Sequence, residues 1–221
     1  NSMNILDILL PKLHKEGQKF VTISLIITFI FLLLSKVLGF FAILITIWIF
    51  YFFRDPERYP ILDNNFLVSP ADGIISQIIE VDGPSELKLD KLKFTRVSVF
   101  MNVFNCHVNR FPIDCSVKEI FYKPGKFFNA SLDKASEENE RNYISIETKG
   151  NESIALVQIA GLVARRIVVN CSKQEQYKQG DRFGLIRFGS RVDLYIPSNY
   201  KVLAQKGQSV TAGESLLASK N

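Results

Sequence analysis

The chain has 221 residues, with 27 Lys and Arg against 22 Asp and Glu, and a formal net charge of +5. This length holds one substantial domain and an appendage, and the small basic excess does not form the clustered basic stripe of a nucleic-acid-binding protein. Three cysteines, an odd number without Cys-x-x-Cys spacing, argue against a disulfide framework and against a zinc site. We therefore expect no nucleic-acid partner and no metal ion.

The N-terminal quarter is dominated by apolar residues. Residues 4–19 predict a short amphipathic helix that lies at a membrane interface. In residues 20–53 the only charge is Lys36. Because about 20 apolar residues span a bilayer, this stretch is too long for one span, and the segment 35–39 interrupts it. We interpret it as a membrane-embedded helical hairpin; a single tilted or broken helix and a buried core hairpin of a soluble protein are the alternatives.

Basic residues stand on both sides of this hairpin. Lys12, Lys15 and Lys19 precede it, and Arg54 and Arg58 follow it. Since positively charged flanks stay on the cytoplasmic side, both ends are expected there, and a mildly basic domain beside the membrane favours anionic lipid head groups. We expect a cell-membrane protein whose main domain faces the cytoplasm.

The residues after the hairpin predict a β domain. Prolines and charges end the apolar run over 53–60, so the expected domains are residues 1–54 and 55–221. Neither a βαβ rhythm nor a GxGxxG motif occurs, and the polar tract 129–142 predicts a surface loop. The fold class is therefore mainly β, an antiparallel sandwich or hybrid barrel. The clearest expected strands cover residues 73–81, 95–100, 143–148, 153–159 and 166–169.

Three residues are the parts of a nucleophilic triad. Ser190 could attack a carbonyl, His107 could take its proton, and Asp72 could orient the imidazole. Taken singly, the histidine is more often structural and the aspartate an ordinary turn residue. Ser190 belongs to the only Gly-Ser step of the chain and lacks a G-x-S-x-G elbow. Because Gly189 has no side chain to shield its carbonyl, the serine is suited to attack its own preceding peptide bond.

Seven short motifs extend this interpretation to a family. They cover residues 52–58, 69–73, 102–110, 123–130, 138–141, 161–167 and 187–192. In this order, behind a membrane hairpin, they resemble the short, archaeal-type phosphatidylserine decarboxylase proenzymes, which are pyruvoyl-dependent.

The resemblance implies a self-cleaving precursor. His107, oriented by Asp72, would deprotonate Ser190, whose oxygen would attack the carbonyl of Gly189. Cleavage between Gly189 and Ser190 would release residues 1–189 and convert Ser190 into a covalent pyruvoyl group at the start of the small chain, residues 190–221. The large and small chains would remain associated. The pyruvoyl group would form a Schiff base with phosphatidylserine and act as electron sink while the lipid loses carbon dioxide to become phosphatidylethanolamine.

Two positions depart from the longer members of the family. These members carry a second histidine where this chain has Phe104, so His107 would serve alone, and they have Gly-Ser-Thr where this chain has Gly-Ser-Arg. The residues by themselves also leave open a membrane-anchored serine hydrolase with the same triad and a non-catalytic hybrid-barrel binding module. A soluble pyruvoyl decarboxylase of amino acids would not explain the hairpin. Homo-oligomerisation is left open.

Overall fold

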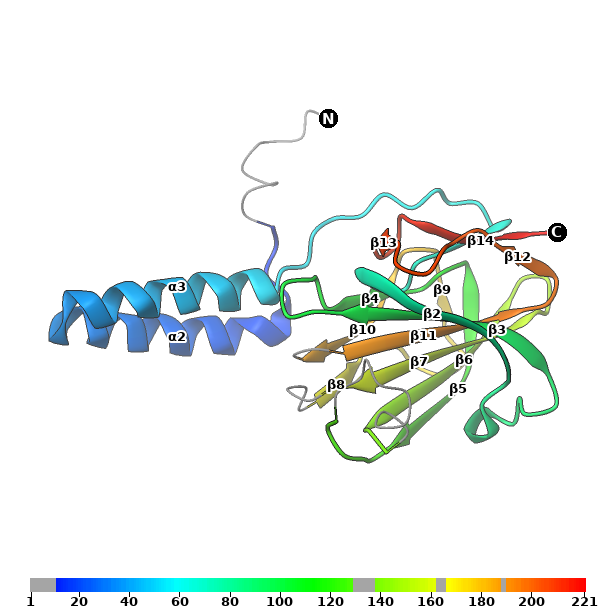
Figure 1. The fold of residues 1–221 in the computed structure, drawn as a ribbon, viewed down its shortest axis with the longest axis horizontal. Helices are drawn as coiled ribbons and strands as arrows, with labels where there is room; N and C mark the ends of the chain where they lie inside the picture. The colour runs from blue at the N-terminus through cyan, green and yellow to red at the C-terminus, as the bar shows by residue number, and fades with distance from the viewer. Residues whose placement is uncertain (1–10, 129–137, 162–165, 188–189) are drawn as a thin grey trace. The chain divides into compact units, whose positions relative to one another are not determined.

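The computed structural model describes residues 11–128, 138–161, 166–187 and 190–221. The chain forms two compact units, Asn1–Glu57 and Arg58–Asn221. The first unit is helical and the second is mainly β (Figure 1).

The first unit is a helical hairpin. Its helices α2 (Lys15–Leu34) and α3 (Lys36–Phe52) are joined by Ser35 alone, whose extended backbone ends one helix and begins the other. Gly39 allows the close approach at this turn, because a Cβ atom there would lie 2.7 Å from Cγ of Leu32. At the open end of the hairpin, the segment before α2 and the segment after α3 are joined by backbone hydrogen bonds.

Two details of the predicted N-terminal region are wrong. The described residues 11–14 of the expected helix 4–19 are not helical, and α2 begins only at Lys15, where Nδ1 of His14 accepts a hydrogen bond from the Glu16 N–H and caps the helix. Residues 4–10 lie outside the described residues. The expected interruption over 35–39 narrows to Ser35, because the rest of that segment continues as α3. The helices are therefore longer than the segment 35–39 suggested, about 30 and 26 Å at 1.5 Å per residue.

The hairpin has polar side chains between its helices and apolar side chains on its outside. Thr46 lies at the centre, with its Oγ1 2.6 Å from Oγ of Ser24 and 2.8 Å from Oγ1 of Thr28. Most of the large apolar side chains of both helices are exposed. This arrangement is typical of helices that lie in lipid, and α2 is long and apolar enough to cross a membrane.

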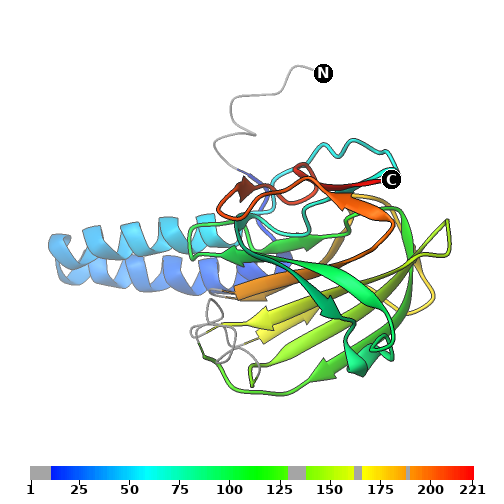
Figure 2. The ribbon, with the colours of Figure 1, turned by 45° about the vertical axis from the view of Figure 1, so that its right-hand side comes forward.

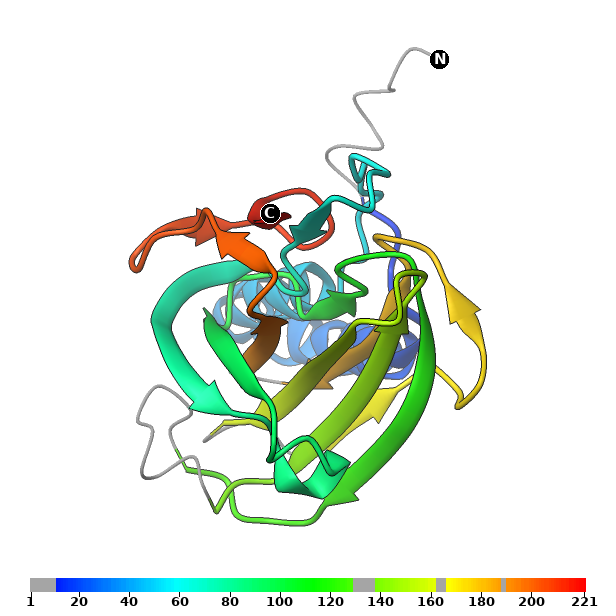
Figure 3. The same cartoon turned by 90° about the vertical axis from the view of Figure 1, so that its right-hand side faces the viewer.

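The second unit is built on one curled antiparallel sheet of eight strands in the order β13-β2-β3-β11-β7-β6-β5-β9 (Figures 2 and 3). Two three-stranded sheets, β1-β14-β12 and β4-β10-β8, complete the unit. The strands are β1 (Phe66–Val68), β2 (Gly73–Asp82), β3 (Lys93–Met101), β4 (Val108–Arg110), β5 (Cys115–Lys123), β6 (Arg141–Thr148), β7 (Ser153–Ala160), β8 (Arg166–Val169), β9 (Gln176–Tyr177), β10 (Arg182–Arg187), β11 (Ser190–Pro197), β12 (Tyr200–Val202), β13 (Ser209–Val210) and β14 (Leu216–Lys220), with a 3-10 helix η1 (Ser85–Leu87).

The prediction of a mainly β, antiparallel fold behind an apolar helical hairpin is confirmed. The five expected strands correspond to β2, β3, β6, β7 and β8. Of the predicted loop 129–142, residues 129–137 lie outside the described residues, and its end already belongs to β6.

The alternation of side chains along β11 decides what the sheet buries. Val192, Leu194 and Ile196 lie in the main apolar core. Since successive side chains of a strand point to opposite faces, Ser190 shares their face and stands at the end of this core. The nucleophile proposed from the sequence is therefore part of the buried inner face.

Candidate active site

Ser190 is the first residue of β11, the strand between β3 and β7. It lies opposite Met101 of β3 on one side and Ala160 of β7 on the other. The serine is fully buried, and its Oγ lies 4.0 Å from Sδ of Met101. Pairing on both sides fixes the backbone of this residue, while Gly189 lies outside the described residues.

His107 stands beside the strand that leads to Ser190. The loop before it starts at Met101, the strand partner of Ser190, and ends at β4. The carbonyl of His107 accepts a hydrogen bond of 3.3 Å from the Ile186 N–H in β10, the strand that precedes Ser190 in the chain. One end of the loop therefore lies next to Ile186 and the other next to Ser190, described residues before and after the proposed cleavage point.

The ring of His107 has a defined tautomer. Its Nδ1 lies 2.9 Å from the carbonyl oxygen of Asn105, and because a carbonyl only accepts hydrogen bonds, Nδ1 carries the proton. The basic lone pair of the neutral ring is then on Nε2. His107 is fully buried, so little water reaches this ring.

Two asparagines hold the loop that presents His107. Oδ1 of Asn105 accepts from the Asn102 N–H at 2.9 Å, and Oδ1 of Asn102 accepts from the Phe104 N–H at 2.8 Å. Such side-chain-to-backbone bonds are typical of tight turns. Phe104, which replaces the second histidine of the longer family members, is 64% exposed.

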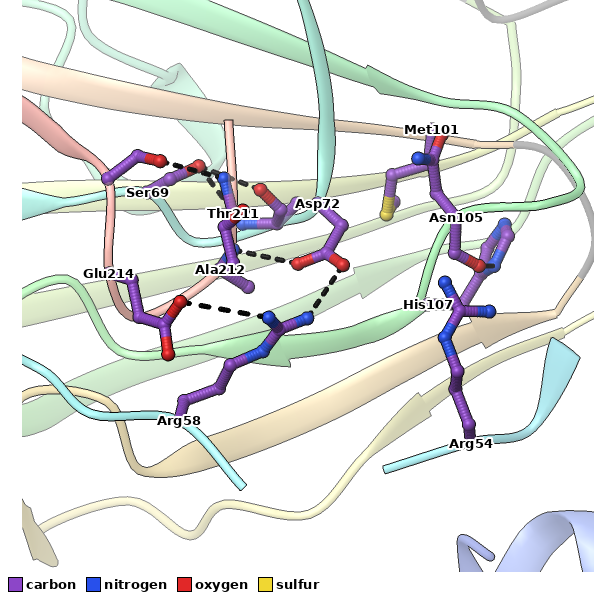
Figure 4. A network of polar contacts seen from close by, with 12 residues as sticks. Arg54, Arg58, Ser69, Asp72, Met101, Asn105, His107, Thr211, Ala212 and Glu214 are labelled. Carbon is purple, nitrogen blue, oxygen red and sulfur yellow. Dashed lines mark hydrogen bonds and ion pairs between the residues drawn. The ribbon is translucent and has the colours of Figure 1, made fainter. Parts of the chain in front are cut away.

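Asp72 takes part in a different set of contacts. Its Oδ2 lies 2.7 Å from Nη2 of Arg58, and its Oδ1 accepts a 2.8 Å hydrogen bond from the Ala212 N–H. Nη1 of Arg58 also lies 3.8 Å from Oε2 of Glu214. Figure 4 shows the carboxylate of Asp72 directed toward Arg58 and Ala212, and the ring of His107 beside Asn105. The structure thus brings Ser190 and the His107 loop together, and the Asp72–His107 pair of the triad stays a prediction.

Several residues of this site were not singled out from the sequence. Arg58 lies in the motif 52–58, but nothing in its spacing showed that it would bind Asp72. Three buried amide side chains are joined by hydrogen bonds in the order Asn142, Gln158, Asn109, and the last of them, Asn109, contacts Met101. A signal for Gln158 did exist, since this glutamine is the one polar residue within the otherwise apolar run 154–160.

We also considered cysteine nucleophiles and metal ligands among the described residues. Burial raises the pKa of Cys171 to about 11 and raises the pKa of Cys115 further, so both thiols are protonated at neutral pH. Groups of three or more His, Cys, Asp or Glu side chains able to hold a metal ion are absent from the part of the chain that the structure describes.

The fold and the site define a mainly β domain with a buried serine at the start of a central strand and a buried histidine on the loop that follows the strand partner of this serine. In the chain, the β domain follows an apolar helix pair. The family model described as Phosphatidylserine decarboxylase matches residues 45–218. The proenzyme of this name from Pelagibacter ubique (strain HTCC1062) is 56% identical over 216 residues, which are 98% of this chain and 100% of that relative. The proenzymes from Ruegeria pomeroyi and Cereibacter sphaeroides are 52% and 47% identical, over 98% of this chain and 99% and 94% of theirs.

The chain therefore belongs to the phosphatidylserine decarboxylase family, in its short form. The family resemblance seen in the seven motifs and the prediction of a decarboxylase are confirmed.

Proposed function

We propose that this chain is the self-processing precursor of a pyruvoyl-dependent phosphatidylserine decarboxylase. The observation that carries the proposal is the position of Ser190, fully buried at the first residue of β11 and next to the loop of His107. The names of the relatives, all proenzymes of phosphatidylserine decarboxylase, support both the precursor state and the substrate.

Cleavage would use the chain's own residues. Nε2 of His107 takes the proton of Ser190 Oγ, and this oxygen bonds to the carbonyl carbon of Gly189. The peptide C–N bond breaks, so the acyl group moves from nitrogen to oxygen. Loss of the Cα proton of residue 190 then breaks its Cβ–Oγ bond and releases residues 1–189 as a carboxylate. Water replaces the nitrogen of residue 190, ammonia leaves, and a pyruvoyl group remains.

The surroundings of Ser190 suit such a group. The site is enclosed by Met101 and Ala160 on the neighbouring strands and has little water to compete with the serine oxygen. The pyruvoyl group supplies an electron sink for the loss of carbon dioxide from an amine substrate. His107 is the buried group that can hold and return a proton there.

The two product chains would stay together because of their strand pairing. The small chain, residues 190–221, contains β11, β12, β13 and β14. β11 pairs with β3 and β7, β14 pairs with β1, and β13 pairs with β2. Removal of the small chain would expose the centre of the eight-stranded sheet, so we expect the cleaved enzyme to remain one folded assembly.

The hairpin is proposed to hold the enzyme at the cytoplasmic face of the cell membrane. Its exposed apolar surface and its internal hydroxyl groups support insertion into lipid. Lys12 and Arg54 both stand at its open end, where basic residues favour the cytoplasmic side. Protease treatment of right-side-out vesicles should leave the β unit intact, and treatment of inverted vesicles should degrade it.

The proposed function is tested by the denaturing intact mass of the purified protein together with release of carbon dioxide from phosphatidylserine vesicles. We expect two chains divided between residues 189 and 190, with the small chain lighter by one ammonia than a fragment that begins with serine. The Ser190→Ala variant should stay uncleaved and inactive. An active wild-type chain that stays whole and reacts with a serine-directed phosphonate would favour the hydrolase instead.

A further inference from the structure

Three amide side chains form a row inside the β unit, and we call Asn142, Gln158 and Asn109 the amide relay. Nδ2 of Asn142 donates to Oε1 of Gln158 at 3.0 Å, and Nε2 of Gln158 donates to Oδ1 of Asn109 at 2.9 Å. Nδ2 of Asn109 in turn points to Sδ of Met101, at 3.7 Å. All three amides are fully buried, and they come from β6, β7 and β4.

Such a row is costly in an apolar core. Burial of an amide without full hydrogen bonding costs about 1–3 kcal/mol, and Ile144 and Leu156 occupy the same face two residues from Asn142 and Gln158. The fold also leaves room for the row at Gly184, where a Cβ atom would lie 2.9 Å from Nε2 of Gln158. A core that needed only packing would use leucine at these positions.

The relay ends at Met101, the strand partner of the candidate nucleophile Ser190. Sδ of Met101 is a weak acceptor, and it lies within 3.7 Å of Nδ2 of Asn109 and 4.0 Å of Oγ of Ser190. The amide N–H and the serine oxygen therefore converge on one sulfur atom, from β4 and β11. The N–H of Asn109 thus faces a poor acceptor, and that acceptor also lies beside the oxygen of residue 190.

We propose that Asn109 donates a hydrogen bond to the oxygen of residue 190 during the reaction, and that Gln158 and Asn142 are positioning residues that orient its amide. This inference rests on the proposed function. As the proton of Ser190 moves to His107, its oxygen gains negative charge, and a preorganised buried donor stabilises that charge. Oδ1 of Asn109 is held by Gln158, so Nδ2 is the atom that faces Met101, the strand partner of residue 190. Each bond of the row polarises the next.

The rate of chain cleavage tests the relay, measured by pulse–chase labelling and gel electrophoresis of the full chain. Asn109→Asp keeps the shape and still accepts from Gln158, but when ionised it has no N–H to donate. We expect Asn109→Asp and Asn109→Leu to slow cleavage at least about tenfold, as for the loss of one donor to a developing charge. Gln158→Leu should slow it similarly, and Asn142→Leu, two bonds away, by a smaller factor.

Gln179→Leu is the matched control. Gln179 is also a buried amide, but its Nε2 donates to the backbone carbonyls of Phe66 and Pro112, not to the relay. This variant should lower the Tm of the precursor and cleave at the wild-type rate, which separates a lost donor from lost stability.

The outcomes separate the relay from the proposed function. Slow cleavage of Asn109→Asp at a Tm no lower than that of Gln179→Leu supports the relay. Wild-type cleavage rates in both Asn109 variants, or a rate that simply follows Tm through all variants including Gln179→Leu, overturn the relay alone. A wild-type chain that never cleaves overturns the proposed function and the relay with it.

Discussion

Arg58 and Asp72 form an ion pair with 2.7 Å between Nη2 and Oδ2, and their side chains are only 14% and 12% exposed. The other oxygen of Asp72 accepts from the backbone of Ala212. Asp72 precedes the proposed cleavage point and Ala212 follows it, so this carboxylate joins the two product chains as well as belonging to the candidate site.

Arg58→Ala should destabilise the precursor by about 2 kcal/mol, because the largely buried carboxylate of Asp72 would lose its counter-ion. Thermal or denaturant unfolding of the full chain in detergent measures the change. Lys93→Ala is the matched control: Lys93 and Asp82 are 2.6 Å apart but 79% and 59% exposed, and exposed pairs of this kind contribute less than about 1 kcal/mol. If Arg58→Ala and Lys93→Ala lowered the free energy of unfolding equally, burial would not strengthen the Arg58–Asp72 pair.

His107→Ala should leave a full-length chain, since the proposed base for Ser190 is removed. The mass of the purified protein measures this directly. His14→Ala serves as control, because the only other histidine of the chain caps α2 and its loss should cost about 1 kcal/mol of helix stability without slowing cleavage. Normal maturation of the His107→Ala chain would show that another group takes the serine proton.

Asp114 should make the β unit sensitive to acid. Burial alone would raise its pKa, but hydrogen bonds from the Gln179 N–H and from Lys149 and Lys178 outweigh burial and lower the pKa to about 2. An unfolded aspartate has a pKa of about 3.9, so the carboxylate contributes about 2 kcal/mol of stability at neutral pH. This contribution is complete above about pH 5 and is lost progressively as the pH falls toward about 1.

The Asp114→Asn variant tests this pH dependence by denaturant unfolding between pH 7 and pH 2. It should be less stable than wild type at pH 7 by about 2 kcal/mol, and the difference should shrink in acid. Asp82→Asn, a change at a largely exposed carboxylate, should leave the dependence of stability on pH almost unchanged. A constant difference between Asp114→Asn and wild type at every pH would refute the role of ionisation.

Gly39→Val should loosen the helical hairpin, because a Cβ atom at this position would collide with Leu32. Cysteines replacing Ser24 and Thr46, whose hydroxyl oxygens are 2.6 Å apart, should form a disulfide under mild oxidation and report on helix packing. Addition of Gly39→Val should reduce the cross-linked fraction several-fold. Phe40→Val, a change at the exposed neighbouring residue, should not reduce the cross-linked fraction. Equal cross-linking in the Gly39→Val and Phe40→Val proteins would contradict the close packing at Gly39.

Local patterns account for what was predicted correctly. The apolar run with one charge indicated a helix pair, and period-two alternation indicated strands such as β3, because both signals come from neighbouring residues. The same signals predicted the helix start too early, before Lys15, and predicted a break of five residues where only Ser35 interrupts the helices. The start of α2 depends on a cap by His14, which is not among the usual capping residues. The break at Ser35 depends on the contact of Gly39 with Leu32, which forms only when the two helices lie together.

The sequence by itself determined the family, the Gly189–Ser190 step and the candidate residues His107 and Asp72, because these are written in short motifs. Only the tertiary structure decided which strands flank Ser190, that Arg58 binds Asp72, and that a row of three distant amides ends at Met101. Alternation along a strand tells which side chains share a face, but not which strand lies next to it. That choice is made by packing between segments far apart in the chain, and the chemistry of the site depends on it.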